Sequence, residues 1–332
     1  MNYYLGVDAG GSKTYTLIVD EQGTVVGRGS AGNGNHQLGY DEAKANITSS
    51  VEAALAEAGL ERKDIAFAYF GLAGADRETD YKILRPLIAG LGFPNYDINC
   101  DTVIALRAGT DRPYGVVLIC GSGTNSAGRN SVGQFYQCGG FSYLFGDFAG
   151  GHTLAKEAFR AVIRAWDGRE APTSLTGALL ARLGYESVQA MFDDYLDHDK
   201  CDVPLDVAKL VFDAALAGDA VAQRLLHTQG DELGKAAAAV IQRLGMQEDE
   251  FDVVLAGSIV TRGQGPYVID PIQAYVSGAA PKAKVVKLST EPVVGAVWLA
   301  IEASGGQVTG EVHEKLKRIS DYNAIPSQTK RV

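Results

Sequence analysis

A glycine-rich segment near the N-terminus has residues that could bind a phosphate. Residues 6–14 read GVDAGGSKT, in which two glycines have the spacing of a phosphate-binding P-loop but Ser12 comes before Lys13. A P-loop must open a helix, whose N-terminus helps to hold the phosphate. The residues that follow, 14–20, are rich in β-branched and aromatic types and predict a strand. We therefore interpret the segment as the tip of a hairpin.

A second segment repeats this arrangement about 110 residues later. Residues 121–126 read GSGTNS, follow the apolar run 115–120 and precede further residues typical of strands. Glycines let backbone N–H groups approach an anion closely, and hydroxyls add further donors. The repeat predicts a duplicated domain and two hairpins that hold one polyphosphate from both sides.

Asp8 lies inside the first glycine-rich turn. A carboxylate at that place would repel a phosphate unless a divalent cation lies between them. Mg²⁺ takes one or two carboxylates, usually keeps several waters and bridges phosphate oxygens. The alternative is that Asp8 only caps the turn, as aspartate often does. We expect the metal role.

Two further aspartates precede predicted helices, and the residues alone leave two roles open for each. Asp101 could be a helix N-cap, or it could accept a proton from a substrate hydroxyl, as phosphoryl transfer requires. Asp147, in the segment GDFAGG, could cap the next helix or bind a polyol through two hydrogen bonds. Its spacing favours the cap.

Two glycine-containing turns are weaker candidates. Residues 32–36, GNGNH, form a loop of the residue types that routinely make turns. Residues 255–259, LAGSI, follow a strand and could pack against a flat nucleotide base, because glycine permits close approach. Taken alone, this second segment is better explained as a plain strand-to-helix turn.

Alternating strands and helices must position these residues. The first part of the chain predicts the order β-β-β-α-β-α-β-α, a mixed sheet with helices packed on it. The expected strands are 3–7, 14–19, 24–28, 65–71 and 96–100, and the expected helices are 40–59, 76–92 and one that begins at 102.

The second part of the chain begins near Gly109–Tyr114, where Gly, Asp and Pro cluster. We accordingly predict one domain over residues 1–112 and a second over 113–304, followed by a polar tail, 305–332, with a mobile end. After the second hairpin the pattern predicts helices from 150 to 244, strands 251–256 and 284–288, helices 266–278 and 291–304, and a short helix over 312–319.

Composition excludes several classes of protein. The 332 residues are 46% hydrophobic and 21% charged, which is typical of soluble globular proteins and sufficient for two domains. The formal net charge of −10 argues against nucleic acid as a partner. The chain has no membrane-spanning run and no secretory signal, so we expect a cytoplasmic protein. Its four cysteines have the spacing of neither a disulfide framework nor a zinc site.

Taken together, these segments resemble the sugar kinase/Hsp70/actin superfold, and more narrowly the BadF/BadG/BcrA/BcrD ATPase family, which includes N-acetylglucosamine and glucosamine kinases. The resemblance covers about residues 3–304 and depends on the order of the segments. Residues 6–14 and 120–125 resemble the two phosphate motifs, 255–260 the adenosine motif and 292–298 the closing helix near the hinge. It implies an α/β fold of two ribonuclease H-like (actin-like ATPase) domains, each a mixed five-stranded sheet with flanking helices, with a cleft between them.

The resemblance also implies roles for residues. Asp8 would hold Mg²⁺, Asp101 matches the family's catalytic base, Asn35 and His36 match its sugar loop, and Gly146 and Asp147 open its second sugar motif. The residues expected to bind ATP are Gly10, Gly11, Ser12, Lys13, Thr14, Gly121, Ser122, Gly123, Thr124, Asn125, Gly257 and Ser258.

The second sugar motif departs from the family pattern. The sugar kinases continue Gly-Asp-Glu-Gly-Ser, whereas this chain reads Gly-Asp-Phe-Ala-Gly, with Phe148 and Gly150 in place of the acidic and hydroxyl residues. This leaves N-acetylglucosamine, glucosamine and another hexose open as the sugar.

The favoured function is an ATP-dependent sugar kinase whose partners are a small sugar and ATP, with Mg²⁺ as cofactor; a homodimer is left open. One alternative is an ATPase that activates a reductase or dehydratase through an iron–sulfur cluster, but Cys120 lies in the phosphate loop and Cys138 and Cys201 have no recognisable cluster context. The other is a non-catalytic sugar or nucleotide sensor, against which the retention of Asp8 and Asp101 argues.

Overall fold

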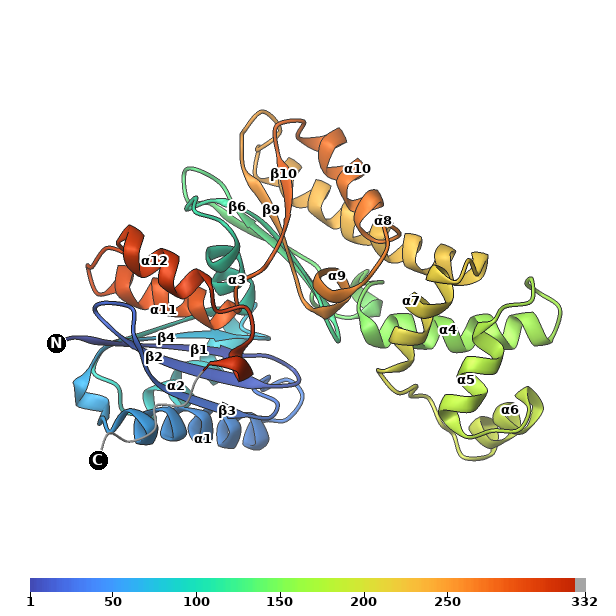
Figure 1. Ribbon diagram of the computed structural model, residues 1–332, viewed down its shortest axis with the longest axis horizontal. Helices are drawn as coiled ribbons and strands as arrows, with labels where there is room; N and C mark the ends of the chain where they lie inside the picture. Colours follow the sequence, from blue (N-terminus) through green and yellow to red (C-terminus); the bar gives the residue numbers. More distant parts are fainter. Residues whose placement is uncertain (326–332) are drawn as a thin grey trace. The chain divides into compact units, whose positions relative to one another are not determined.

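A computed structural model describes residues 1–325 of the chain. The chain forms two compact units, which are described separately (Figure 1). Among the described residues, the first unit contains 1–117 and 286–325, and the second contains 118–285. Within residues 1–325, none of the helices has the length and apolar character needed to cross a bilayer.

The first unit is built on a five-stranded mixed sheet. Its order is β3-β2-β1-β4-β5, with antiparallel pairing among the first three strands and parallel pairing of β1 with β4 and of β4 with β5. The strands are β1 (Tyr3–Ala9), β2 (Thr14–Asp20), β3 (Val25–Ala31), β4 (Ile65–Leu72) and β5 (Tyr96–Cys100). β1 and β2 form the predicted hairpin, because the glycine-rich residues between them continue into a strand and not into a helix.

Helices cover both faces of this sheet (Figure 1). Leu5 and Val7 of β1 lie in one core with α1 and α2, whereas Tyr4, on the other face, lies in a second core with α11. The alternation follows from the two-residue repeat of a strand. The helices of this unit are α1 (Tyr40–Ala58), α2 (Glu78–Ala89), α3 (Asp101–Gly109), α11 (Pro292–Ala303) and α12 (Gly310–Lys317), with short 3₁₀ turns at Arg62–Asp64 and Tyr322–Ala324.

Gly6 allows α11 to lie directly against β1. A Cβ atom added at Gly6 would lie 2.6 Å from the backbone nitrogen of Val297 and 2.9 Å from the carbonyl oxygen of Val293. Any larger residue would push the helix away from the sheet. Gly6, the first residue of the sequence GVDAGGSKT, is therefore needed for the packing of α11 on β1.

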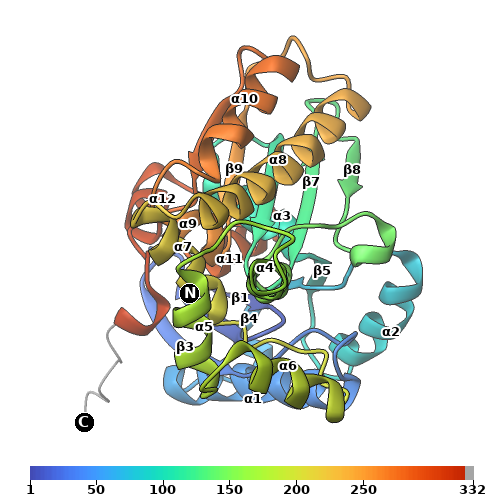
Figure 2. The ribbon, with the colours of Figure 1, turned by 90° about the vertical axis from the view of Figure 1, so that its right-hand side faces the viewer.

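The second five-stranded sheet has the order β10-β9-β6-β7-β8, and most of it belongs to the second unit, whose two boundaries fall within β6 and β10. Its strands are β6 (Gly115–Cys120), β7 (Thr124–Arg129), β8 (Phe135–Cys138), β9 (Asp252–Ala256) and β10 (Lys284–Lys287). The long helix α8 (Ala220–Arg243) and α10 (Ile269–Ala279) pack side by side, and α8 contacts β7 (Figure 2).

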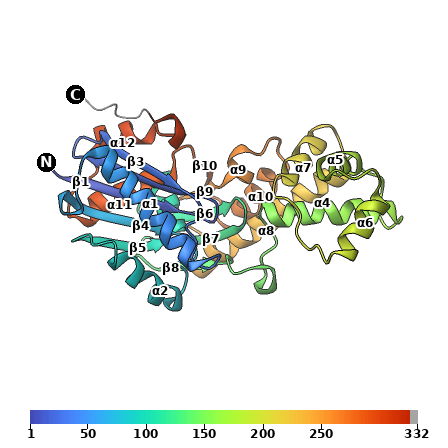
Figure 3. The ribbon, with the colours of Figure 1, turned by 90° about the horizontal axis from the view of Figure 1, so that it is seen from below.

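Four further helices of the second unit form a helical cluster (Figure 3). They are α4 (Gly151–Trp166), α5 (Leu175–Leu183), α6 (Val188–Asp197) and α7 (Val207–Leu216). A 3₁₀ turn, η2 (Tyr143–Phe145), precedes them, and the short helix α9 (Ser258–Arg262) follows β9. The predicted helical stretch from 150 to 244 is thus five separate helices, α4 to α8.

The two mixed five-stranded sheets confirm the predicted fold class, but the division of the chain differs from the prediction. The first unit ends at Val117 and not at residue 112, and the helix predicted over 291–304 belongs to it and not to the second domain. α11 packs on β1, α3 and β4, so its contacts are with the first sheet.

The tail also differs from the expectation. The chain after α11 continues into α12, which includes most of the short helix predicted over 312–319, and residues up to Ile325 pack into the first unit. Residues 326–332, where a mobile end was expected, lie outside the described residues.

Candidate active site

Three aspartates lie where the parallel strands of the first sheet end. Asp8 is near the end of β1, Asp76 follows β4, and Asp101 directly follows β5 as the first residue of α3. The carboxyl ends of parallel strands share one edge of a sheet, which is where α/β folds usually bind ligands. Asp101 is not the N-cap of α3, because Cys100 occupies that position and no side chain caps the helix. The structure thus does not support the capping role for Asp101.

The electrostatics of these carboxylates are strongly perturbed. Burial, the neighbouring Asp101 and Glu291 raise the pKa of Asp8 to about 7, and Lys13 acts in the opposite direction. Burial and the charge of Asp76 raise the pKa of Asp101 to about 6, although hydrogen bonds from Cys100 and Thr102 oppose this rise. A carboxyl with a pKa near 6 is suited to accept a proton at neutral pH.

Cys100 joins two of these aspartates. Its Sγ lies 3.1 Å from Oδ1 of Asp101 and 3.3 Å from Oδ1 of Asp76, so the thiol can donate its one proton to either carboxylate. Sequence reasoning missed Asp76. Its position just after a buried strand, in the segment GLAGAD, is the signal that could have found it.

A backbone hydrogen bond closes the turn of the first hairpin, and the residues at its tip are exposed. The backbone N–H of Gly10 donates to the carbonyl of Lys13 over 2.9 Å, and Gly11, Ser12 and Lys13 are exposed. The Thr14 hydroxyl is buried and donates to the carbonyl of Gly32 over 2.9 Å. Thr14 thus joins the hairpin to the loop of residues 32–36.

That loop carries the predicted sugar residues Asn35 and His36. The N–H of Gly34 donates to the carbonyl of Gly10 over 2.9 Å, which holds the loop beside the hairpin. Asn35 accepts a hydrogen bond at Oδ1 from the N–H of Gln37 over 2.9 Å, which fixes its side-chain amide.

His36 is buried within the first unit. Its Nε2 lies 3.5 Å from Oδ1 of Asp80, and Asp80 accepts hydrogen bonds from Arg77. Its Nδ1 is buried and has no hydrogen-bond partner among residues 1–325. These contacts give the His36 side chain a role in holding the loop.

The second hairpin closes in the same way as the first. The N–H of Gly121 donates to the carbonyl of Gly123 over 2.9 Å. The first N–H groups of α4, from Gly151 and His152, donate to the carbonyls of Gly121 and Ser122 over 2.8 and 3.0 Å. The Thr124 hydroxyl donates to the carbonyl of Ile119 over 3.1 Å. The start of α4 is thereby tied to this hairpin.

The predicted adenosine turn lies next to the second hairpin. Gly257 has a φ of +91°, a conformation that favours glycine, and precedes Ser258 at the start of α9. A Cβ atom on Gly257 would lie 2.5 Å from the carbonyl carbon of Cys120 and 2.8 Å from the nitrogen of Gly121. The structure therefore brings together two segments that lie about 135 residues apart and were both predicted to bind the nucleotide.

Asp147 does not cap α4, so the role that its spacing favoured is wrong. The N-cap is Gly150, and it has no side-chain cap. Instead Oδ1 of Asp147 accepts from the N–H of Gly140 over 3.1 Å, and Oδ2 accepts from those of Phe141 and Ser142, both over 2.7 Å. Asp147 closes a loop, residues 139–147, that also contains the predicted residue Gly146.

Gln229 was not found from the sequence. It is 1% exposed in α8, and its side chain accepts from the N–H of Gly150 over 2.9 Å and donates to the carbonyl of Phe148 over 3.1 Å. It thus fixes the segment in which this chain departs from the family pattern. An isolated glutamine in a helix carries no sequence signal for such a contact.

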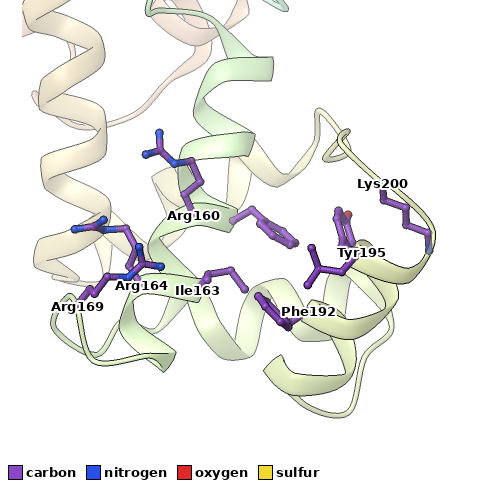
Figure 4. Close-up of a pocket in the computed structure, with 9 residues that line it drawn as sticks. Arg160, Ile163, Arg164, Arg169, Phe192, Tyr195 and Lys200 are labelled. Carbon is purple, nitrogen blue, oxygen red and sulfur yellow. The ribbon is translucent and has the colours of Figure 1, made fainter.

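The helical cluster has a hollow of about 290 Å³ between α4 and α6. Figure 4 shows Phe192 and Tyr195 of α6 facing Ile163 of α4. The cations at its rim, such as Arg160 with Glu157 and Arg169 with Asp167, have carboxylate partners. None of the predicted site residues lines this hollow.

The acidic residues of the first unit fit a single divalent cation. Among residues 1–325 no group of three or more His, Cys, Asp or Glu side chains has the arrangement of a metal site. Mg²⁺ does not need one, since it takes one or two carboxylates and fills its other positions with water and substrate phosphates. The charge of Asp101 raises the pKa of Asp8, and this repulsion would be relieved by a cation.

Comparison with known proteins places this geometry in context. The sequence model of the BadF/BadG/BcrA/BcrD ATPase family matches residues 5–300. The chain is 28% identical over 314 residues to an N-acetyl-D-glucosamine kinase from Dictyostelium discoideum, with 90% of this chain and 98% of that protein covered. It is also 28% identical over 305 residues to an N-acetylmuramic acid/N-acetylglucosamine kinase from Clostridium acetobutylicum, with the same coverage.

A solved structure shares the fold. It is a crystal structure, provisionally described as an N-acetylglucosamine kinase from Chromobacterium violaceum, with a TM-score of 0.68 and 24% identity, covering 90% of this chain and 99% of that one. This likeness shows the fold, and the two five-stranded sheets agree with it.

Proposed function

The chain belongs to the BadF/BadG/BcrA/BcrD ATPase family, and we propose that it is an ATP-dependent kinase that phosphorylates a hydroxyl of an amino sugar. N-acetylglucosamine and glucosamine are the favoured acceptors. The relatives from Dictyostelium discoideum and Clostridium acetobutylicum, aligned over 90% of this chain, support this class of substrate.

One observation carries the proposal. Asp101 lies at the carboxyl edge of the first sheet, and burial and Asp76 raise its pKa to about 6. At neutral pH this carboxylate is ionised yet basic enough to accept the proton of a sugar hydroxyl that attacks the γ-phosphate.

Asp8 is the proposed residue that holds Mg²⁺. The cation would neutralise the charge of the phosphates when it is bound with ATP. Its presence would also favour the ionised form of Asp8, whose pKa is about 7. Lys13 lies at the exposed tip of the hairpin and would pair with a phosphate oxygen.

The nucleotide is proposed to bind to the glycine-rich segments already described. Gly11 and Ser12 of the first hairpin, and Ser122 and Gly123 of the second, would supply backbone N–H groups and hydroxyls. The N–H of Gly10 already donates to the carbonyl of Lys13, so Gly10 would act by shaping the turn. The close packing of Gly257 against Cys120 supports a shared role for the second hairpin and the turn at Gly257–Ser258. The hydroxyls of Thr14 and Thr124 already donate to backbone carbonyls, so these two residues would act through the backbone.

The proposed sugar residues fall into two groups. The Asn35 amide, fixed by Gln37, would bind a sugar hydroxyl, and His36 would hold the loop in place from behind. Asp147 would shape the loop at Gly146 through its three N–H contacts. Gln229 holds the backbone of Phe148 and Gly150 in place, so the substituent on the sugar would contact a segment with one fixed conformation.

An ADP-release assay over a panel of hexoses and amino sugars, with and without Mg²⁺, tests the proposal. We expect ADP release that depends on Mg²⁺ and is greatest with N-acetylglucosamine or glucosamine. Release that is the same with every sugar and with none would contradict it. We also propose that the chain acts in the cytoplasm, and cell fractionation followed by the same assay on the cytoplasmic and membrane fractions tests this.

A further inference from the structure

The chain beyond the family match reaches the first hairpin. The match ends at residue 300, and nothing in it covers α12 or the 3₁₀ turn at Tyr322–Ala324. Val312, Leu316 and Tyr322 are nevertheless buried in the same core as α11 and β2. We call residues 310–325 the C-terminal segment. It is part of the first unit, so its contacts with the hairpin lie inside one compact body.

Tyr322 is held rigidly on the first sheet. Its ring stacks on that of Tyr15 with 3.9 Å between the ring centres and 9° between the planes. Its hydroxyl lies 2.8 Å from the carbonyl of Thr16 and 2.6 Å from that of Gly29, so one phenol spans β2 and β3. Burial raises the pKa of Tyr322, which keeps the phenol protonated and able to donate.

Tyr15 in turn holds the ammonium group of Lys13. Nζ of Lys13 lies 3.1 Å from the Tyr15 hydroxyl and 4.3 Å from the centre of the ring. The Tyr15 ring is 6% exposed, and Tyr322 covers one of its faces. The Nδ2 atom of Asn323 is 3.5 Å from the same hydroxyl. The C-terminal segment therefore limits where Tyr15 can lie, and Tyr15 limits where the Lys13 ammonium can lie.

The position of that ammonium matters for an anion. A lysine is a compact charge on a flexible four-carbon stem, and ordering it on binding costs conformational entropy. A contact that restricts the stem before the ligand arrives reduces this cost.

We propose that Tyr322 is a positioning residue that acts through Tyr15 to hold Lys13 where the first hairpin binds the phosphates of ATP. This inference rests on the proposed function of the hairpin. It assigns a role in nucleotide binding to the C-terminal segment, which otherwise only completes a core. A purely structural Tyr322 would affect stability and leave ATP affinity unchanged in the folded protein.

A double-mutant cycle on the full chain separates the two roles. ATP affinity is measured by calorimetry with Mg²⁺ and without sugar for the wild type, Tyr322→Leu, Lys13→Met and the double variant. We expect Tyr322→Leu to weaken binding about fivefold and Lys13→Met about tenfold. The double variant should bind like Lys13→Met alone, because Tyr322 has no other route to the nucleotide.

Control variants distinguish an effect through Tyr15 from a general disturbance of the C-terminal segment. Lys315→Ala lies in the same segment and loses contacts with Gln22 and Thr24, not with Tyr15, so its ATP affinity should equal that of the wild type. Tyr322→Phe keeps the stacked ring and should restore affinity to within about twofold of the wild type. If Tyr322→Leu does not fold, Tyr15→Phe replaces it, since this variant keeps the stack and loses the hydroxyl near Lys13.

Three results would overturn the inference, and they are distinguishable. If Tyr322→Leu lowers the melting temperature but leaves ATP affinity unchanged, or if its effect adds to that of Lys13→Met, Tyr322 does not act through Lys13. If Lys13→Met itself binds ATP like the wild type, Lys13 has no part in nucleotide binding and the proposed function of the hairpin tip fails as well.

Discussion

At the scale of single residues, the chemistry depends on how Asp101 is surrounded. The side chain is not needed to cap α3, and it shares the Cys100 thiol with Asp76. Burial and a neighbouring negative charge both disfavour its ionised form, which raises its pKa to about 6. Because these surroundings favour a neutral side chain, an amide at this position should cost little folding stability. A substitution can therefore remove the base without unfolding the site.

Asp101→Asn should lower kcat by a factor of about 10²–10⁴ and leave ATP affinity largely intact. The amide keeps the size of the side chain but cannot accept the hydroxyl proton. Steady-state kinetics with N-acetylglucosamine, together with calorimetry of ATP binding, measure the two effects. A variant that turns over at a near-normal rate would remove Asp101 from the role of base.

The activity should also depend on pH in a defined direction. The pKa of Asp101 is raised to about 6, and only its ionised form can accept a proton, so kcat should be constant above this value. Below it, kcat should fall about tenfold for each pH unit. The measurement is kcat at saturating ATP and sugar from pH 5 to 8. A profile that stays flat down to pH 5 would contradict the assignment.

The sequence revealed some of these residues and not others. Asp101 lies between a short strand and a helix, as the sequence predicts, whereas Asp8 was expected inside the glycine-rich turn and lies instead near the end of β1. Asp76 was missed although it follows a buried strand, whereas Gln229 carries no local pattern, since its contact with Gly150 is made with a residue distant in the chain. Asp147 was misjudged because the start of α4 is set by Gly150, three residues later.

At the scale of elements, the loop of residues 139–147 owes its shape to one side chain. Three backbone N–H groups converge on the Asp147 carboxylate, and Tyr143, Leu144 and Phe145 at its tip are exposed. Hydrogen bonds to a carboxylate are stronger than neutral ones, so a single side chain sets the shape of this loop.

Asp147→Asn should loosen the loop and leave the rest of the fold intact. One amide cannot accept as many N–H bonds as a carboxylate, because its NH₂ group is itself a donor. We expect amide hydrogen exchange of residues 140–146 to become about tenfold faster, with the melting temperature within a few degrees of the wild type. Unchanged exchange accompanied by a higher KM for the sugar would instead identify Asp147 as a direct sugar ligand.

Most elements could be predicted because their residue patterns are local. The expected strand over 14–19 is β2 at Thr14–Asp20, and the expected helix over 40–59 is α1 at Tyr40–Ala58. The helix expected over 76–92 is shorter, Glu78–Ala89, and contains Pro86. The sequence could not predict which sheet a given helix packs against, because that choice depends on tertiary packing and not on the local residue pattern.

At the scale of the whole molecule, the chain returns to its first unit after completing the second. α11 lies on the face of the first sheet at Gly6, and the C-terminal segment adds to the same core. Sequence order alone assigned residues 291–304 to the second domain, because the pattern of an apolar helix does not state which sheet it covers. The folded first unit therefore depends on two distant parts of the chain.

A chain that ends at Val285 should lack a folded first unit. It would expose the face of the sheet that α11 covers, including Tyr4 and Leu17, to water. We expect it to be insoluble, or to bind ATP at least about a hundredfold more weakly than the full chain. A soluble truncated protein whose ATP affinity equals that of the full chain would contradict this account of the core.

The central claim is that the γ-phosphate of ATP is transferred to a sugar. The most direct test incubates the full chain with ATP, Mg²⁺ and N-acetylglucosamine and quantifies ADP, inorganic phosphate and sugar phosphate by mass spectrometry. The account predicts one sugar monophosphate for each ADP, with little inorganic phosphate. ADP and inorganic phosphate in equal amounts with every amino sugar and hexose, and no sugar phosphate, would show an ATPase that is not a sugar kinase.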